Sequence, residues 1–198
     1  MYNEKRYGTG KVTHFRQARR LLMATSQAAG PLWEFQWGSS TSVCLVNRVL
    51  LKAVQTGTAT AEELRFNLKI ARAFTAVDST NTASIKRAGD MQKMNGDFAD
   101  SLLTDFRESN SATAAAGGTK TEDTDPIAIG SFVSIANAST SDSGGGYTMV
   151  FNFNPSATHD MPLRIEQNEG WIINLEATKG ATQGVVLFLE TAWSEVLL

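Results

Sequence analysis

The sequence predicts an all-β protein, an antiparallel β-sandwich of jelly-roll type that is preceded by an extended N-terminal arm. Three observations support this prediction. Apolar and polar residues alternate in several segments, and turn residues separate those segments at near-regular intervals. No long segment shows the period of an amphipathic helix. About eight β segments with this spacing are typical of a sandwich or barrel, and their length favours a jelly roll.

Residues 1–31 are predicted to form an arm outside the sandwich. The segment has few apolar residues and no sustained period, although residues 14–29 could form a short amphipathic helix that Gly30 and Pro31 would end. Two interpretations remain open, an arm that becomes ordered only against a partner and a loose terminus. The predicted boundaries are therefore 1–31 for the basic arm and 32–198 for the β-sandwich domain.

The arm is basic although the whole chain is not. The net charge of the protein is −2, yet the first 20 residues contain six basic side chains and one acidic side chain. A basic arm on an acidic body favours docking on an acidic surface. The predicted partner-binding residues are Lys5, Arg6, Lys11, Arg16, Arg19 and Arg20.

The first three predicted strands follow the arm. Residues 32–37 alternate, with Trp33, Phe35 and Trp37 on one side. Residues 43–54 are apolar on both faces, which indicates a strand that is central in its sheet or covered on both sides. Residues 63–74 alternate most clearly of all and predict a half-buried strand of an antiparallel sheet.

Residues 75–125 form the least regular part of the chain. Residues 84–88 could form a helical turn, 98–106 a short helix or an irregular strand, and 109–125 a loop or weak edge strand. A connection of this length is unusual in a compact domain and is more often an interaction element than a loop without a role. We therefore expect it to contact a partner together with the arm.

The remaining strands lie in the last third of the chain. Residues 126–136 and 147–153 are predicted strands, and residues 161–198 predict a hairpin of two long strands joined by a Gly-rich turn. Seven apolar residues of this hairpin are predicted to lie in the core or between the sheets: Trp171, Ile173, Leu175, Val185, Leu187, Leu189 and Trp193.

No group of residues predicts an enzyme, a metal site or a cofactor. His14 and His159 lack the spacing of a metal site. Cys44 lies in an apolar run and is interpreted as a buried structural thiol.

Two groups of carboxylates have similarly simple interpretations. Glu122, Asp123 and Asp125 lack the remaining pattern of a calcium loop and are interpreted as a solvated turn. Glu166 and Glu169 are interpreted as turn residues of the hairpin, because nothing indicates the cleft that an acid–base pair would need.

The four tryptophans and the lack of membrane signals argue against nucleic-acid and membrane partners. The tryptophans are interpreted as core residues, since no basic residues are interleaved with them as single-stranded nucleic acid would require. No run approaches the roughly 18 apolar residues of a membrane helix, and no signal peptide is evident. The sequence thus predicts a soluble protein made in a reducing cytoplasm, with neither membrane nor direct nucleic-acid partners.

Both ends of the predicted sandwich resemble small virion proteins of tailed bacteriophages. The resemblance is carried by PLWEFQWGSSTSVCLVNRVLLKA (31–53) with the alternating strand 63–74, and by MPLRIEQNEGWIIN followed by KGATQGVVLFLETAWSEV. It covers most of 31–198, weakly through 75–125, and consists of turns and apolar positions. Such proteins are β-sandwich components of the particle, commonly head decoration or cement proteins, and some are tail-associated.

The resemblance implies a structural, non-enzymatic role. We expect a virion structural protein on the capsid surface, made in the host cytoplasm, that decorates or cements the capsid by binding major capsid protein subunits, and that forms homo-oligomers. Two alternatives remain open: a tail, neck or fibre-base component of the virion, and, by fold analogy and the tryptophans, a carbohydrate-binding β-sandwich module.

Overall fold

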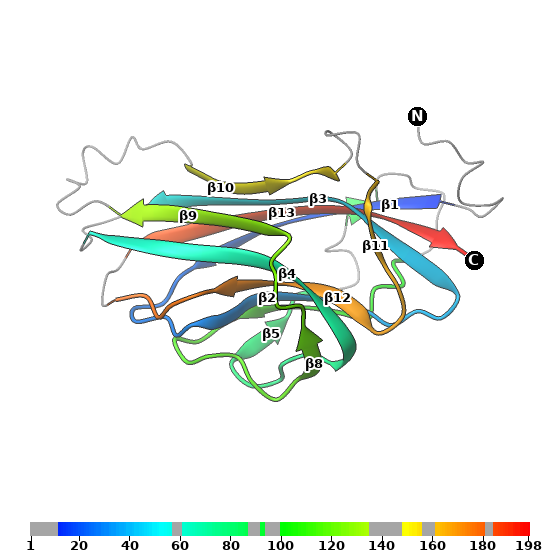
Figure 1. The fold of residues 1–198 in the computed structure, drawn as a ribbon, viewed down its shortest axis with the longest axis horizontal. Helices are drawn as coiled ribbons and strands as arrows, with labels where there is room; N and C mark the ends of the chain where they lie inside the picture. Colours follow the sequence, from blue (N-terminus) through cyan, green and yellow to red (C-terminus); the bar gives the residue numbers. More distant parts are fainter. Residues whose placement is uncertain are drawn as a thin grey trace.

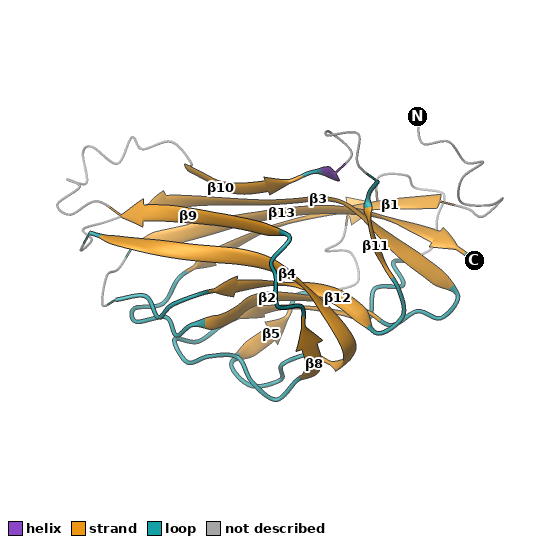
Figure 2. Cartoon of the chain, in the orientation of Figure 1, coloured by secondary structure: helices purple, strands orange, loops and turns teal. Residues whose placement is uncertain are grey.

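The computed structural model describes residues 12–56, 61–86, 92–93, 100–134, 148–155, 161–180 and 184–198, with Gln92 and Lys93 described by their backbone alone. These residues form two antiparallel sheets that face each other (Figure 1). No α-helix occurs among them, and the short purple piece after β10 in Figure 2 is a 3₁₀ turn at Pro155. The predicted all-β sandwich is therefore confirmed.

The first sheet, here called the β3–β13 sheet, has the strand order β10-β3-β13-β1-β6, and β11 also pairs with β3. Its strands are β1 (Val12–Leu22), β3 (Ser42–Gln55), β6 (Gln92–Lys93), β10 (Thr148–Phe153), β11 (Leu163–Ile165) and β13 (Val185–Leu197). The central pair, β3 with β13, extends from Val185 opposite Gln55 to Leu197 opposite Ser42. Strand β3 is thus central, as its apolar sequence predicts.

The second sheet, here called the β4–β12 sheet, has the strand order β5-β7-β2-β12-β4-β8, and β9 also pairs with β4. Its strands are β2 (Gly30–Trp37), β4 (Glu62–Ala76), β5 (Thr82–Ser84), β7 (Asp105–Ser109), β8 (Thr119–Glu122), β9 (Ala128–Ser134) and β12 (Glu169–Leu175). The strands predicted at 32–37, 63–74, 126–136 and 147–153 are all confirmed, as β2, β4, β9 and β10 respectively.

The pairing of the eight principal strands is that of a jelly roll. Strand β1 pairs with β13, β2 with β12, β3 with β10 and β4 with β9, so the first half of the chain pairs with the second half in reverse order. This nested arrangement is a long antiparallel hairpin rolled into two four-stranded sheets, β10-β3-β13-β1 and β9-β4-β12-β2. The short strands β5, β7 and β8 belong to the insertion between β4 and β9.

Aromatic side chains from both sheets fill the core. Phe35 stacks on Trp171 at 5.2 Å between ring centroids and meets Trp193 of the facing sheet edge-on at 5.3 Å. Phe15 of β1 stacks on Trp193 at 5.5 Å, and Phe106 of β7 meets Trp171 edge-on at 5.5 Å. Such offset and edge-to-face contacts add to the burial of large apolar surfaces. The core is therefore continuous from β1 to the insertion.

The sandwich closes on one side where β9 and β10 approach each other. A side chain at Gly130 of β9 would overlap the backbone carbonyl of Val150 in β10, so only glycine permits this distance. Because β9 belongs to one sheet and β10 to the other, this contact joins the two sheets at their edges.

The prediction of an N-terminal arm is wrong for residues 12–31. Residues 12–22 form neither a helix nor a free arm but strand β1, which pairs with β13 from Val12 opposite Val196 to Leu22 opposite Val186. The sandwich therefore includes residues N-terminal to position 32, and residues 1–11 lie outside the described part of the chain.

The period of β1 is hidden because two of its inward side chains are polar. Gln17 is buried and donates a hydrogen bond from Nε2 to the Ile85 carbonyl at 3.2 Å. Arg19 forms an ion pair with Glu108 of the opposite sheet at 2.8 Å. Since both partners lie far along the chain, the local sequence does not show that these positions face inward.

The predicted C-terminal hairpin is also wrong. Strands β12 and β13 do not pair with each other, because β12 lies between β2 and β4 while β13 lies between β3 and β1. Consecutive along the chain, β12 and β13 therefore belong to different sheets. All seven predicted core residues of this segment are nevertheless buried in one cluster, as expected.

The insertion between β4 and β9 is built of short strands. Its described part contains β5, β6, β7 and β8, and no helix occurs among the described residues of the segments 84–88 and 98–106. The weak edge strand expected within 109–125 is β8. The insertion extends the β4–β12 sheet at the β2 edge through β7 and β5, and its strand β8 pairs with β4. Its strand β6 pairs with β1 of the β3–β13 sheet.

Candidate interaction surface

The outward side chains of the β3–β13 sheet form rows across its strands, because register sets which residues are neighbours. In one row Arg20 lies opposite Phe188, which lies opposite Lys52. In a second outward row, two rows away from the first, Arg16 lies opposite Ala192, and Ala192 lies opposite Arg48. Arg164 of β11 extends a third row beyond Leu45. We call the set Arg16, Arg20, Arg48, Lys52 and Arg164 the basic face.

One carboxylate lies within the basic face. Glu190 Oε1 accepts ion pairs from Arg16 at 3.1 Å and from Arg48 at 2.9 Å, so it connects β1, β13 and β3. Arg164 pairs with Glu166 at 3.1 Å, and Arg20 has no carboxylate partner among the described residues. The described strands of this sheet thus place five cationic side chains on the outer face, and two carboxylates, Glu190 and Glu166, lie beside them.

The strands of the β4–β12 sheet show the opposite arrangement. Each of their described basic side chains has a carboxylate partner. The pairs are Arg65 with Glu63 at 2.9 Å, Lys69 with Glu122 at 4.0 Å, Arg72 with Asp123 at 2.9 Å and with Glu169 at 2.7 Å, Arg107 with Asp105 at 2.8 Å, and Lys120 with Glu34 and Asp78. The excess positive charge of the described strands is therefore confined to one face of the sandwich.

The six basic residues predicted to bind a partner are only partly brought together. Arg16 and Arg20 lie on the basic face, whereas Arg19 faces inward and pairs with Glu108. Lys5, Arg6 and Lys11 lie outside the described residues. Arg48, Lys52 and Arg164 were missed, because they interrupt apolar runs in β3 and β11 and meet β1 only through the sheet register.

A buried ion triplet lies on the other side of the molecule, beneath the insertion. Lys120 Nζ contacts Glu34 Oε1 at 2.5 Å and Asp78 Oδ2 at 2.9 Å, and it lies 5.7 Å from the centroid of the Phe74 ring. The Asp78 amide donates to Glu34 Oε2 at 2.8 Å, and the Gly118 amide donates to Asp78 Oδ1 at 2.7 Å. The triplet thus fixes two stretches of the insertion to β2.

The surroundings of the triplet shift its three pKa values. Burial raises the pKa of the Glu34 carboxyl, against the opposing effect of Lys120. Burial would also raise the pKa of Asp78, but the hydrogen bond and charge of Lys120 outweigh it, so the pKa lies below its usual value. Burial acts to lower the pKa of Lys120, and its bonds to Asp78 and Glu34 reverse this into an increase. These directions favour the charged forms of Lys120 and Asp78, whereas burial disfavours the charged form of Glu34.

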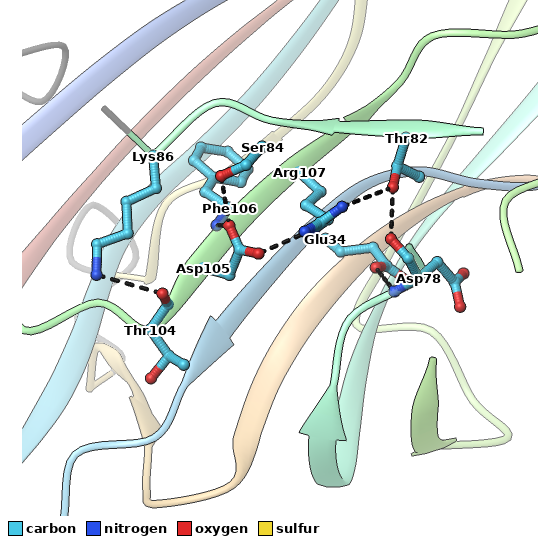
Figure 3. Close-up of polar contacts among 9 residues, drawn as sticks. All are labelled: Glu34, Asp78, Thr82, Ser84, Lys86, Thr104, Asp105, Phe106 and Arg107. Carbon is cyan, nitrogen blue, oxygen red and sulfur yellow. Dashed lines mark hydrogen bonds and ion pairs between the residues drawn. The ribbon is translucent and has the colours of Figure 1, made fainter. Parts of the chain in front are cut away.

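A chain of polar contacts continues from the triplet through the insertion (Figure 3). Thr82 Oγ1 donates to the Asp78 carbonyl and accepts from Arg107 at 3.3 Å. Arg107 pairs with Asp105 at 2.8 Å, and Asp105 accepts from the Ser84 hydroxyl at 2.7 Å. Each of these groups is satisfied by a neighbour within the insertion, so the chain holds β5 against β7.

A second buried carboxylate, Glu195, connects β13 to the segment that precedes β7. It accepts hydrogen bonds from the Ser101 hydroxyl, from the Leu102 amide at 2.9 Å and from Trp193 Nε1 at 3.1 Å. Burial raises the pKa of Glu195 in spite of these bonds. Burial, followed by the Glu195 charge, also raises the pKa of the Cys44 thiol well above its usual value. Cys44 is fully buried, which confirms its interpretation as a structural thiol.

The other residues considered from the sequence have contacts within the fold. His14 is exposed and its Nδ1 lies 2.7 Å from the Ser194 hydroxyl, while His159 is outside the described residues. Glu166 precedes the turn that leads into β12 and Glu169 is the first residue of that strand, and the Glu166 amide donates to Glu169 Oε2 at 2.9 Å, as their turn interpretation predicts.

The acidic cluster of the insertion also differs from a metal site. Glu122 accepts from Asn174 at 2.7 Å, and Asp123 pairs with Arg72, so these carboxylates face basic or amide groups. Among the described residues, no group of three or more potential ligands could hold a metal ion. The same part of the chain contains no helix that could span a membrane.

All four tryptophans are fully buried, which confirms that they fill the core. Trp37 donates from Nε1 to the Ser42 carbonyl at 3.1 Å, and Trp193 donates to Glu195. These rings consequently offer no exposed stacking surface to a sugar or a base.

The basic face is therefore the part of the described surface where cationic side chains outnumber the carboxylates beside them. Comparisons of the chain with protein-family models, with curated proteins and with solved structures found no match.

Proposed function

We propose that this chain is a bacteriophage virion structural protein that decorates the capsid and cements neighbouring major capsid protein subunits. The observation that carries the proposal is the jelly-roll pairing of the eight principal strands, an architecture used by viral capsid proteins, lectin domains and cupins. Because a fold alone does not assign a function, the proposal also depends on the sequence resemblance.

The resemblance to phage virion proteins is carried by the framework of the fold. Its N-terminal part covers β2, β3 and β4, and its C-terminal part covers β11, β12 and β13. These segments supply the central strands of both sheets. The similarity of turns and apolar positions therefore involves the residues that define the sandwich, which supports a shared architecture with particle components.

A repeating partner also suits a small protein of this kind. Each contact with a capsid subunit adds to the stability of the bound protein, and several modest contacts on a lattice combine through effective concentration. The buried polar clusters at Glu34 and Glu195 are explained by contacts that hold the insertion to the sheets. The proposal accordingly assigns the protein no catalytic step and no cofactor.

The copy number in purified particles tests the proposal. Quantitative mass spectrometry should find the protein at the copy number of the major capsid protein, or at a fixed fraction of it, and electron microscopy should place it on the head. A few copies per particle at the neck or tail would favour a tail, neck or fibre-base component instead. Absence from purified particles would refute a virion role altogether.

A deletion of the gene provides the functional control. Heads assembled without the protein should lose their genomes at lower temperature than wild-type heads, and added purified protein should restore their stability. Equal thermal stability of the two kinds of heads would leave a decorating role without a cementing role.

A further inference from the structure

We infer that the basic face is the surface through which this protein docks, and that its partner is a protein surface rich in carboxylates. The inference rests on the proposed function in identifying that partner as the capsid. It goes further in assigning the contact to one side of one sheet, rather than to an N-terminal arm or to the insertion.

Charge distribution is the first support for the inference. The protein has a net charge of −2, yet the outer face of the β3–β13 sheet carries five cations, of which Arg16 and Arg48 share Glu190 and Arg164 pairs with Glu166. On the β4–β12 sheet each basic side chain of the strands has its own carboxylate. A one-sided excess of charge orients a protein as it approaches a complementary surface.

Accessibility is the second support. The side chains of Arg16 and Arg164 are 46% and 56% exposed, and Arg20 is also exposed. Since these residues come from strands, their backbone positions are set by the sheet. Glu190 in addition holds Arg16 and Arg48, which lowers the conformational entropy that these side chains would lose on binding. The face is thus ordered before its partner arrives.

The composition of the face favours a protein over a nucleic acid. The exposed apolar residues Leu22 and Met149 and the half-buried Phe188 are interleaved with the arginines. Arginine, methionine and aromatic residues are the types enriched in protein interfaces. Arginine forks can bind the carboxylates of a protein surface through paired hydrogen bonds. These features fit a carboxylate-bearing protein surface.

Charge-reversal variants test the inference. The binding target is purified heads from a phage that lacks this gene, and the variants are Arg20→Glu, Arg164→Glu and the double substitution. Arg65→Glu is the matched control, because Arg65 is an exposed strand arginine on the other sheet. We expect each single variant to bind about tenfold more weakly, and the double variant about a hundredfold more weakly, as the charges act at separated sites.

The control variant should bind normally, and added salt should weaken the binding of the wild type. Arg65→Glu should bind heads within about twofold of wild type, and binding of the wild type should weaken as ionic strength rises from about 0.1 M to about 0.5 M. Circular dichroism and thermal unfolding of every variant should match those of the wild type, so that lost binding reports on the surface and not on folding.

The outcomes separate the inference from the proposed function. If wild type binds heads and the double variant binds equally well, the basic face is not the docking surface, while capsid binding stands. If wild type does not bind heads, the proposed function fails and this inference fails with it. Tighter binding of duplex DNA than of heads, with the same loss in the double variant, would overturn the assignment of a protein partner.

Discussion

Replacing Lys120 with methionine should strongly destabilise the fold. Lys120 contacts two carboxylates that are almost completely buried, with Glu34 1% and Asp78 5% exposed. Methionine keeps most of the apolar stem but removes the charge. Leaving one member of a buried ion pair without its partner costs about 3–5 kcal/mol. Stabilities of whole domains are about 5–15 kcal/mol, so this loss is a large part of the total.

The pH dependence of the variant gives an independent estimate of this cost. Without Lys120 the buried carboxyls would have to bind protons to remain inside, and neutralising a carboxyl of ordinary pKa near 4 at pH 7 costs about 4 kcal/mol. The folded variant would then bind more protons than its unfolded chain. Its stability should therefore rise as the pH falls from about 7 to about 5, by about 1.4 kcal/mol per pH unit for each such carboxyl.

The wild type should show a weaker pH dependence over the same range. The pKa of Glu34 is higher in the folded protein than in the unfolded chain. The wild type therefore loses stability as the pH rises from the unfolded pKa of this carboxyl to its folded pKa. The lowered pKa of Asp78 acts in the opposite direction, since its contribution is lost as the pH falls through the folded pKa. The Asp78 effect lies below the ordinary pKa of 3.8, so of these two carboxyls only Glu34 changes the stability of the wild type between pH 5 and 7, whereas both would do so in the Lys120→Met variant.

Urea unfolding at pH 5, 6, 7 and 8, followed by tryptophan fluorescence, measures both quantities. Lys69→Met is the control, because Lys69 forms a half-exposed pair with Glu122 at 4.0 Å and should cost less than about 1 kcal/mol. The combined replacement of Lys120 by Met, Glu34 by Gln and Asp78 by Asn should recover much of the loss. A cost below about 1 kcal/mol for Lys120→Met, with no change in pH dependence, would refute the reasoning.

Three further predictions follow from the fold. Phe15→Ala should lower the free energy of unfolding of the isolated protein by about 3–5 kcal/mol, because the Phe15 ring lies in the core. If residues 12–22 were an arm that becomes ordered only on a partner, the substitution would not change this stability. Gly130→Ala should lower the stability by about 2–3 kcal/mol, because the new methyl group meets the Val150 backbone. Gly180→Ala is the control and should cost less, because its methyl group meets only the movable Glu62 carboxylate, and equal thermal shifts would contradict the close approach of β9 and β10. Cys44 should react with a thiol reagent only as the protein unfolds, since burial raises its pKa; rapid stoichiometric labelling of the native protein would show that the thiol is accessible.

The two ends of the chain show where reasoning from local sequence fails. Strand β1 has alternating inward and outward side chains, but inward Gln17 and Arg19 are polar, and their partners Ile85 and Glu108 lie far along the chain. At the other end, alternation predicted the buried faces of β12 and β13 correctly but did not predict their neighbours. A two-residue period shows which side chains of a strand share a face. It does not show which other strand pairs with that strand.

The basic face shows the same limit for function. The sequence concentrates basic residues before position 21, which drew attention to Arg16, Arg19 and Arg20 together. In the sheet, adjacent positions point to opposite sides, so Arg19 enters the inter-sheet contact while Arg20 faces outward. Arg48 and Lys52 join the face because β13 lies between β1 and β3. No count of charge along the chain could have assembled this set.

Local sequence patterns were enough to predict the class of the fold, most of the strand positions, the buried tryptophans and the buried position of Cys44. These properties depend on local alternation and on the apolar character of single side chains, which act over a few residues. The tertiary structure alone decided that residues 12–22 belong to the sandwich, that β12 and β13 lie in different sheets, and that cations from three strands share one face with Glu190. These properties depend on pairing between segments as distant as β1 and β13, and the energy of such pairing comes from contacts that exist only once the chain has folded.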